Sequence, residues 1–234
     1  MRSNILCLET SAAKCSVALT YAHDQIIYKE AAVSYSHVSQ ITLLIKECIE
    51  EANIKFEELD AVAISGGPGS YTGLRVGAST AKGICFAKDI PLIALDTLQV
   101  IGHTLIAHET NHGKSLYISI IDARRDEVYL AGYDKELDQV LDTQAFILSG
   151  DSFKSESDHY GQIIIGGDAT AKAADIISSN RIIYRHIIPN ASHMAELALK
   201  AFSEQVFEQL SSYTPSYLKS PNITVSKKQF FRNN

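Results

Sequence analysis

Residues 61–77 have the sequence AVAISGGPGSYTGLRVG, which predicts a strand, a tight turn and a helix in that order. The apolar run of residues 61–65 is short and ends in glycine, as is typical of a fully buried strand. The glycines and the proline of residues 66–69 interrupt regular pairing, so we expect the strand to end at Ser65. A helix over about residues 70–87 then completes a strand–turn–helix unit of an α/β protein.

The flanking sequence extends this unit into a mixed sheet with helices against it. Alternating or apolar runs predict strands at residues 5–9, 15–20, 25–30 and 90–95. The first three have short connections, which favours an antiparallel meander. Helical periodicity predicts two further helices, over residues 36–52 and 97–108. Ser36 is the expected N-cap of the first, because its hydroxyl can accept from a free backbone N–H.

The second half of the chain begins like the first. Residues 115–122 and 126–133 predict a hairpin, and residues 162–165 predict a buried strand before another glycine pair. Helical patterns follow over residues 169–179 and 192–209, whereas the polar run 151–160 is expected to be a surface loop. The repeated opening predicts a duplicated fold, followed by a basic tail at residues 227–232.

Composition narrows the class of protein. The chain has 234 residues, 46% hydrophobic and 21% charged, which excludes a disordered chain. No apolar run reaches the roughly 18 residues that span a bilayer, so we expect a cytoplasmic protein that does not bind membranes. The net charge of −6 argues against autonomous nucleic-acid binding. The four cysteines lie in apolar stretches without a C-x-x-C pair, which predicts buried free thiols.

Two segments could bind an anion. The glycine-rich turn presents free N–H groups at a helix N-terminus, although it matches neither a Walker A loop nor a Rossmann fingerprint. Its alternative interpretation is a tight strand-to-helix turn that requires glycine. The run from Glu9 to Ser11 ends the first strand and could hold a phosphate or its metal, or simply be a strand end. The candidate contacts for an anion or nucleotide are Thr10, Ser11, Gly66, Gly67, Gly69 and Ser70.

Small residues recur every four positions on the helix predicted at 70–87. Gly73, Gly77 and Ala81 form this stripe, and interior glycines cost roughly 1 kcal/mol each relative to alanine. Such a cost is offset only where another backbone approaches closely. The neighbour could be the helix at 36–52 or a helix of another chain, and the sequence leaves both open.

Catalytic and metal-binding patterns are absent from the sequence. The histidines form no convincing ligand set: His103 and His108 would point about 140° apart on a helix, and His108 and His112 have better spacing but Asn111 and Gly113 break the helix there. No G-x-S-x-G elbow is present. The charged hairpin tip at residues 122–127 is interpreted as a solvated turn with mutual salt bridges.

Several of these segments closely resemble the TsaB family, also called YeaZ. The matching residues are 5–11, 36–37, 63–77, 121–129 and 215–218, so the resemblance runs over nearly the whole chain. It implies a two-lobed actin/Hsp70/sugar-kinase-like (ASKHA) fold of duplicated mixed sheets. The lobes would comprise residues 1–98, which carry the helices 36–52 and 70–87, and residues 99–234, which end in a terminal helix and the basic tail.

The resemblance also implies a function in making threonylcarbamoyladenosine in tRNA. TsaB proteins are accessory subunits that bind and activate the catalytic paralogue TsaD and support recruitment of the ATPase TsaE. The metal-binding histidines of TsaD would match positions near Thr97 and Ile101, neither of which has an imidazole. We therefore expect a non-catalytic chain without metal or cofactor, with ATP or ADP at most at the partner interface and tRNA bound only through the complex.

In the family, the first-lobe helices form the contact with TsaD, and homodimers use the same surface. The apolar and small faces of helices 36–52 and 70–87 are therefore the predicted partner-binding surface: Val38, Ile41, Leu44, Ile45, Cys48, Gly73, Leu74, Gly77, Ala78 and Ala81. The alternative is an enzyme of its own, an ATPase or small-molecule kinase, motivated by residues 9–11 and 166–169. A peptidase of the related glycoprotease type is a third hypothesis.

Overall fold

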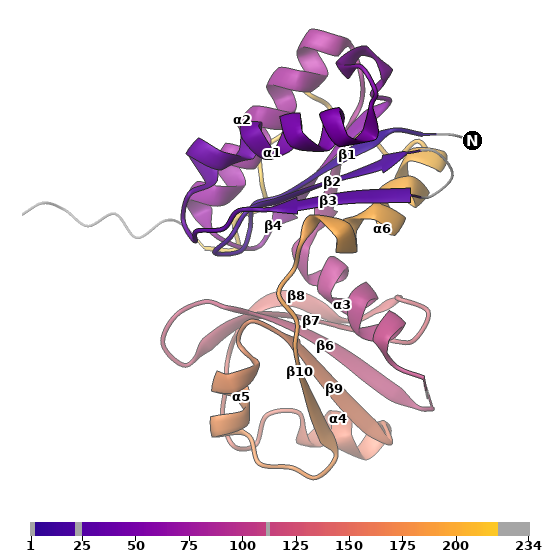
Figure 1. The fold of residues 1–234 in the computed structure, drawn as a ribbon. Helices are drawn as coiled ribbons and strands as arrows, with labels where there is room; N and C mark the ends of the chain where they lie inside the picture. The colour runs from indigo at the N-terminus through magenta and orange to yellow at the C-terminus, as the bar shows by residue number, and fades with distance from the viewer. Residues whose placement is uncertain (1–2, 22–24, 111–112, 220–234) are drawn as a thin grey trace, which may run out of the picture.

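The computed structural model describes residues 3–21, 25–110 and 113–219, and its chain forms two lobes that lie one above the other (Figure 1). The first lobe contains one five-stranded sheet with the strand order β3-β2-β1-β4-β5. Its strands are β1 (Ile5–Glu9), β2 (Ser16–Tyr21), β3 (Gln25–Glu30), β4 (Ala61–Gly67) and β5 (Leu92–Asp96). Two helices, α1 (His37–Ala52) and α2 (Tyr71–Lys88), cover its outer face, with the short 3-10 turn Phe56–Glu58 between α1 and β4.

The second lobe repeats this topology. Its sheet has the order β10-β9-β6-β7-β8, in which β6 pairs antiparallel with β7 and parallel with β9. In the first sheet, β1 likewise pairs antiparallel with β2 and parallel with β4. The strands are β6 (Ser115–Asp122), β7 (Glu127–Tyr133), β8 (Gln139–Ile147), β9 (Gln162–Gly167) and β10 (Ile182–His186), with the short helices α4 (Lys154–His159) and α5 (Thr170–Ile176). The predicted duplication of an α/β fold is confirmed.

Each lobe ends in a helix that packs on the other lobe. Helix α3 (Thr97–His108) follows β5 of the first sheet but packs on β6, β7 and β9 of the second. Helix α6 (Ala191–Ser203) follows β10 but packs on β1, β2 and β5, where Met194 and Ala198 join the first-lobe core. The terminal helix, which was expected in a second lobe of residues 99–234, thus packs on the first sheet, and the predicted lobe boundaries stay a prediction.

The segment after α6 stays on the first lobe. The backbone N–H of Glu208 donates to the carbonyl of Leu92 at 2.8 Å, and that of Ser216 donates to the carbonyl of Gly66 at 2.8 Å. The chain thus returns to the end of β4, close to the glycine-rich turn.

Several local predictions differ from the structure. Strand β4 continues to Gly67, since glycine can still pair in the ladder, and the sequence does not predict the edge strands β8 and β10. Part of the expected loop 151–160 is helix α4, and the last helix ends at Ser203. Ser36 makes no side-chain cap, and its hydroxyl donates instead to Val33 O at 2.6 Å. His112 and the basic tail at 227–232 lie outside the described residues.

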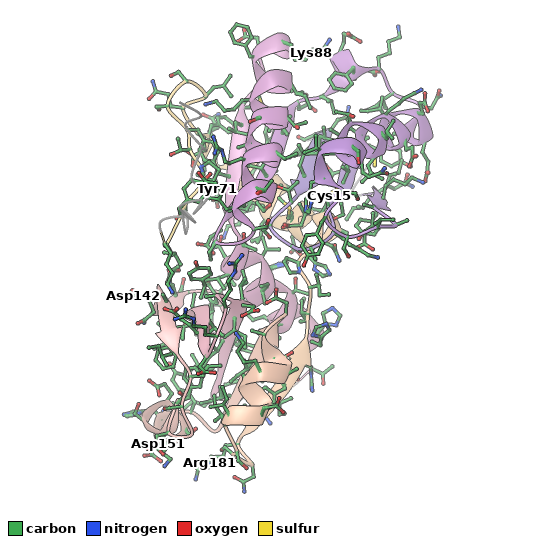
Figure 2. All side chains as sticks on the ribbon, turned by 90° about the vertical axis from the view of Figure 1, so that its left-hand side faces the viewer. Cys15, Tyr71, Lys88, Asp142, Asp151 and Arg181 are labelled. Carbon is green, nitrogen blue, oxygen red and sulfur yellow. The ribbon has the colours of Figure 1, made fainter. Side chains whose placement is uncertain are left out.

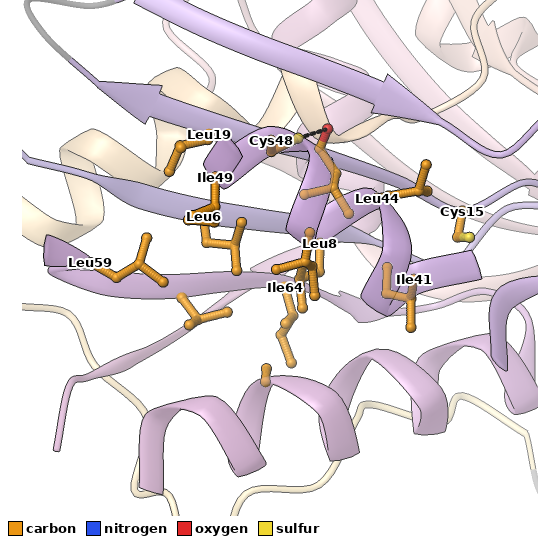
Figure 3. Close-up of a cluster of buried hydrophobic side chains, with 14 of the residues drawn as sticks. Leu6, Leu8, Cys15, Leu19, Ile41, Leu44, Cys48, Ile49, Leu59 and Ile64 are labelled. Atoms are coloured by element: carbon orange, nitrogen blue, oxygen red, sulfur yellow. Dashed lines mark hydrogen bonds between the residues drawn. The ribbon is translucent and has the colours of Figure 1, made fainter. Parts of the chain in front are cut away.

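The core of the first lobe lies between α1, α2 and the sheet. Figure 3 shows Ile41, Leu44 and Cys48 of α1 among Leu8 and Ile64 of the central strands. The thiol of Cys48 donates to Val17 O at 3.8 Å, and all four cysteines are free and buried, as predicted. Among the described residues, no helix is both long and apolar enough to cross a membrane.

Candidate docking groove and interlobe cleft

A surface groove runs between α1 and α2 on the outer face of the first lobe. We call it the α1–α2 groove, and its volume is about 430 Å³. Val38 at its margin is 74% exposed, which is high for a large apolar side chain. Arg75 lies over the Tyr71 ring, 5.3 Å from the centroid, and donates to the Tyr71 hydroxyl at 3.1 Å. The lining residues are Val38, Ile41, Thr42, Tyr71, Thr72, Arg75, Val76, Ser79 and Thr80.

Most of the side chains predicted to bind a partner lie inside the lobe instead. Ile41 is 1% exposed and only forms the floor of the groove, and of the ten predicted contacts only Val38 is exposed. The reason is that the apolar stripe of an amphipathic helix faces its own sheet first. The prediction is corrected for the buried members, which are Leu44, Ile45, Cys48, Gly73, Leu74, Gly77, Ala78 and Ala81.

The glycine stripe of α2 faces the end of β1 and neither of the two neighbours expected for it. A Cβ on Gly73 would lie 2.0 Å from the carbonyl oxygen of Thr10, and one on Gly77 would lie 2.3 Å from the Thr10 hydroxyl. Real Cβ contacts are never this short, so α2 can approach β1 only with glycine at both positions. The close approach that the sequence indicates is present, but it is internal to the lobe.

The polar and charged lining residues could not be found from apolar periodicity. Thr42, Ser79 and Thr80 look like ordinary solvated positions in the sequence. The one available signal was the spacing of Tyr71 and Arg75, because residues four apart on a helix are neighbours. That spacing predicts the ring–guanidinium contact that is observed.

A second cavity, the interlobe cleft, has a volume of about 980 Å³. Figure 2 shows Tyr71 at the end of α2 that faces the second lobe, with Lys88 at the far end. The first lobe contributes Ser11, Gly69, Ser70 and Tyr71 to the cleft. The second lobe contributes the turn between β6 and β7 together with Asp168, and the C-terminal segment contributes residues 216–219.

The structure divides the predicted anion contacts into two groups. Ser11, Gly69 and Ser70 line the interlobe cleft, whereas Thr10, Gly66 and Gly67 do not. The helix N-terminus is partly satisfied within the chain, because Ser70 Oγ accepts from Gly73 N–H at 3.2 Å. The backbone N–H of Ser70 itself donates to Ser11 O at 2.8 Å. Internal bonds thus occupy part of the predicted anion site, and anion binding stays a prediction.

The charged turn between β6 and β7 pairs with distant segments. Asp122 forms an ion pair with Lys172 of α5, and Glu127 forms one with Lys219 of the C-terminal segment. The expected mutual salt bridges within the turn are therefore wrong. Asp122 also accepts from Arg124 N–H at 2.9 Å, which supports the left-handed backbone of Arg124.

Glu9 is a buried carboxyl at the end of β1. It is 0% exposed, and its Oε1 accepts both the backbone N–H and the hydroxyl of Ser11 at 2.5 Å. Burial raises the pKa of the Glu9 carboxyl, although the bonds from Ser11 act in the opposite direction. Through Oε1 the Glu9 side chain holds the turn after β1, and Glu9 does not line the interlobe cleft.

We expect the wild-type chain to lose stability as the pH rises, and we expect Glu9→Gln to abolish this loss. The unfolded chain releases the Glu9 proton near the ordinary pKa of 4.5, whereas the folded chain holds it to higher pH. The folded state then binds more protons, so the wild-type free energy of unfolding falls with pH above 4.5. Melting temperatures of both chains from pH 4.5 to 8 check this. The exposed Glu47→Gln is the control, and parallel curves for Glu9→Gln and wild type would refute the assignment.

Positions Thr97 and Ile101 lie four residues apart on α3 and are fully buried. Thr97 carries a hydroxyl group and Ile101 an alkyl group, so neither can bind a metal ion as a histidine imidazole does. Within residues 3–21, 25–110 and 113–219, no group of three His, Cys, Asp or Glu side chains is arranged to hold a metal ion.

The sequence of the chain is similar to those of known proteins. The family described as TsaD, tRNA N6-adenosine threonylcarbamoyltransferase, matches residues 29–226. The Haemophilus influenzae tRNA threonylcarbamoyladenosine biosynthesis protein TsaB is 35% identical over 56% of this chain and 54% of its own length. The Escherichia coli protein of that name is 24% identical over 92% of this chain and 94% of its own length.

The fold also has solved counterparts. The structure of YeaZ from Pseudomonas aeruginosa superimposes with a TM-score of 0.77 over 92% of this chain and 100% of its own, at 22% identity. This similarity confirms the predicted two-lobed fold. The chain spans about half the length of the Haemophilus influenzae relative.

Proposed function

Since the chain belongs to the TsaD family, that of the tRNA N6-adenosine threonylcarbamoyltransferases, we propose that it is a TsaB-like accessory subunit of this tRNA modification. In this role it binds and activates the catalytic paralogue TsaD and supports recruitment of TsaE. It reaches tRNA only through the complex, and its place of action is the cytoplasm.

The observation that carries the proposal is the exposed α1–α2 groove. Its margin joins the apolar Val38 to the Tyr71–Arg75 pair, and aromatic and arginine side chains are enriched in protein interfaces. The groove is formed by the two helices that the sequence resemblance assigns to docking. The docking surface is therefore the set of groove-lining side chains, in place of the buried faces predicted from sequence.

The same surface suits a homodimer, because the groove of one copy can pack against that of a second. A homodimer of this kind competes with the partner for α1 and α2. An excess of TsaD should therefore convert the homodimer into a heterodimer. No complex should contain both a homodimer of this chain and TsaD.

The non-catalytic role rests on α3. In the catalytic relatives, the resemblance assigns an iron or zinc ligand pair to positions that correspond to Thr97 and Ile101. Both are buried here and lack imidazoles, so these positions supply no Lewis acid for transfer to adenosine.

A reconstituted assay tests the activating role. The chain alone should form no threonylcarbamoyladenosine on tRNA, and its addition to TsaD, TsaE and the threonylcarbamoyl-adenylate supply should raise the initial rate at least about tenfold, equivalent to about 1.4 kcal/mol. Product made by the chain alone would refute the proposal, as would an unchanged initial rate on its addition.

The ATPase or kinase alternative makes a different prediction. Calorimetry with ATP and Mg²⁺ on the isolated chain should show no tight binding under the accessory-subunit proposal. Tight binding together with turnover in the absence of a partner would favour the enzyme alternative. A peptidase would instead carry stoichiometric metal, which elemental analysis detects.

A further inference from the structure

The C-terminal strap, residues 213–219, contacts the glycine-rich turn, the first residue of α2 and the charged turn between β6 and β7. Its first contact is with the glycine-rich turn. Ser216 N–H donates to Gly66 O at 2.8 Å, and a Cβ on Gly67 would lie 2.5 Å from Ser216 O. Gly67 has a φ of +106°, so glycine is required both by its backbone and by the strap. The strap backbone is thus seated directly on the end of β4.

The second contact is aromatic. The rings of Tyr217 and Tyr71 have centroids 4.9 Å apart and planes inclined by 45°, within the range of favourable aromatic pairs. Tyr71 is the first residue of α2 and is also contacted by Arg75. The strap is therefore attached to the helix that borders the interlobe cleft.

The third contact crosses to the other lobe. Lys219 forms an ion pair with Glu127, which begins β7 of the second sheet. The Glu127 side chain is only 25% exposed, whereas Lys219 is 40% exposed, so solvent screens the pair less than a fully exposed one. Ser216, Tyr217, Leu218 and Lys219 all line the cleft between these attachment points.

We infer that the strap is a latch that holds the two lobes at one degree of closure. Its backbone bond and its aromatic contact anchor it to the first lobe, and its Lys219–Glu127 pair anchors it to the second. Releasing either end removes a connection across the mouth of the cleft, and the lobes then sample more open arrangements. The latch belongs to the isolated chain, so it stands or falls independently of partner binding.

The distance between the lobes in the full-length chain tests the latch. Nitroxide labels at Lys46→Cys on α1 and Asp151→Cys beside α4 report this distance, since both native side chains are exposed and lie on different lobes (Figure 2 labels Asp151). The native cysteines are buried, and burial raises the pKa of Cys7 and Cys48 to about 12 and that of Cys85 to about 11. Native thiols with so little thiolate should not take the label.

The labelled wild type should give one narrow distance distribution in pulsed electron paramagnetic resonance. Lys219→Glu should add a longer component, and Tyr217→Ala with Lys219→Glu should increase its population at least about threefold. The charge swap Lys219→Glu with Glu127→Lys should restore the narrow distribution, and Tyr217→Phe, which keeps the ring, should leave it unchanged. Lys219→Glu alters an exposed group and does not threaten folding. Identical distributions in wild type, Lys219→Glu and the double variant would overturn the latch, as would a swap that opens the lobes further.

Discussion

A carboxylate at position 38 is expected to abolish docking of the catalytic partner while the first lobe stays folded. Val38 is 74% exposed in the isolated chain, so Val38→Glu carries little folding cost. In the complex the new charge would be buried without a partner, which costs on the order of 3–5 kcal/mol. The dissociation constant should therefore rise more than about 100-fold. Titration calorimetry with TsaD measures this, with circular dichroism as the check on folding.

The same helix provides a matched control. Leu43 is 51% exposed but does not line the groove, and it lies about 140° around the helix from Val38. Leu43→Glu introduces the same charge on the same helix and should leave the dissociation constant within about threefold of wild type, less than about 0.7 kcal/mol. Equal losses for the two variants would show that the groove is not the docking surface.

Ile41→Glu, the variant that the sequence pattern suggests, does not make a clean test. Ile41 is 1% exposed in the core of the first lobe, where Figure 3 shows it beside Leu8. A charge there destabilises the lobe itself, so any loss of docking would follow from unfolding.

Alanine at position 73 is expected to destabilise the chain, whereas alanine ten residues further along the same helix should stabilise it. A Cβ on Gly73 would lie 2.0 Å from the Thr10 carbonyl oxygen, so α2 must move away from β1. Such overpacking should lower the free energy of unfolding by about 3 kcal/mol. No atom lies within 4 Å of a Cβ on Gly83. There alanine should add up to about 1 kcal/mol through its higher helix propensity.

Denaturant unfolding of the two variants and the wild type measures the expected decrease and the expected increase in the free energy of unfolding in one experiment. The pair separates the two explanations for the small residues of α2. If Gly73 existed to admit a partner helix, Gly73→Ala would weaken docking and leave the isolated chain as stable as the wild type. That result would contradict the internal contact with Thr10.

The parts of the fold that sequence could predict are those with strong local signals. The apolar run of β4 and the glycines behind it predict a buried strand that leads into a helix, and the structure confirms both. The strands β8 and β10 lie at sheet edges, where exposure on both faces removes the apolar alternation that marks a strand. The exchange of α3 and α6 between lobes leaves no local trace, because periodicity shows that a helix has an apolar face but not which sheet covers it.

The same limit explains the correction at the docking site. The apolar faces of α1 and α2 were assigned to a partner, but their own sheet covers them first. What remains outside is a mixed surface in which Val38 stands among polar groups such as Thr42 and Arg75. Its pattern resembles that of any solvated helix face. The groove becomes recognisable only once the two helices are seen side by side.

We propose that this chain binds the catalytic subunit TsaD through the outside of its first lobe. Titration of TsaD from the same cell into the untagged chain tests it most directly. We predict saturable binding with one chain per TsaD and a dissociation constant below about 1 µM, equivalent to about −8 kcal/mol. Two folded proteins that show no heat of binding, and that sediment separately at roughly 100 times that concentration, would contradict it.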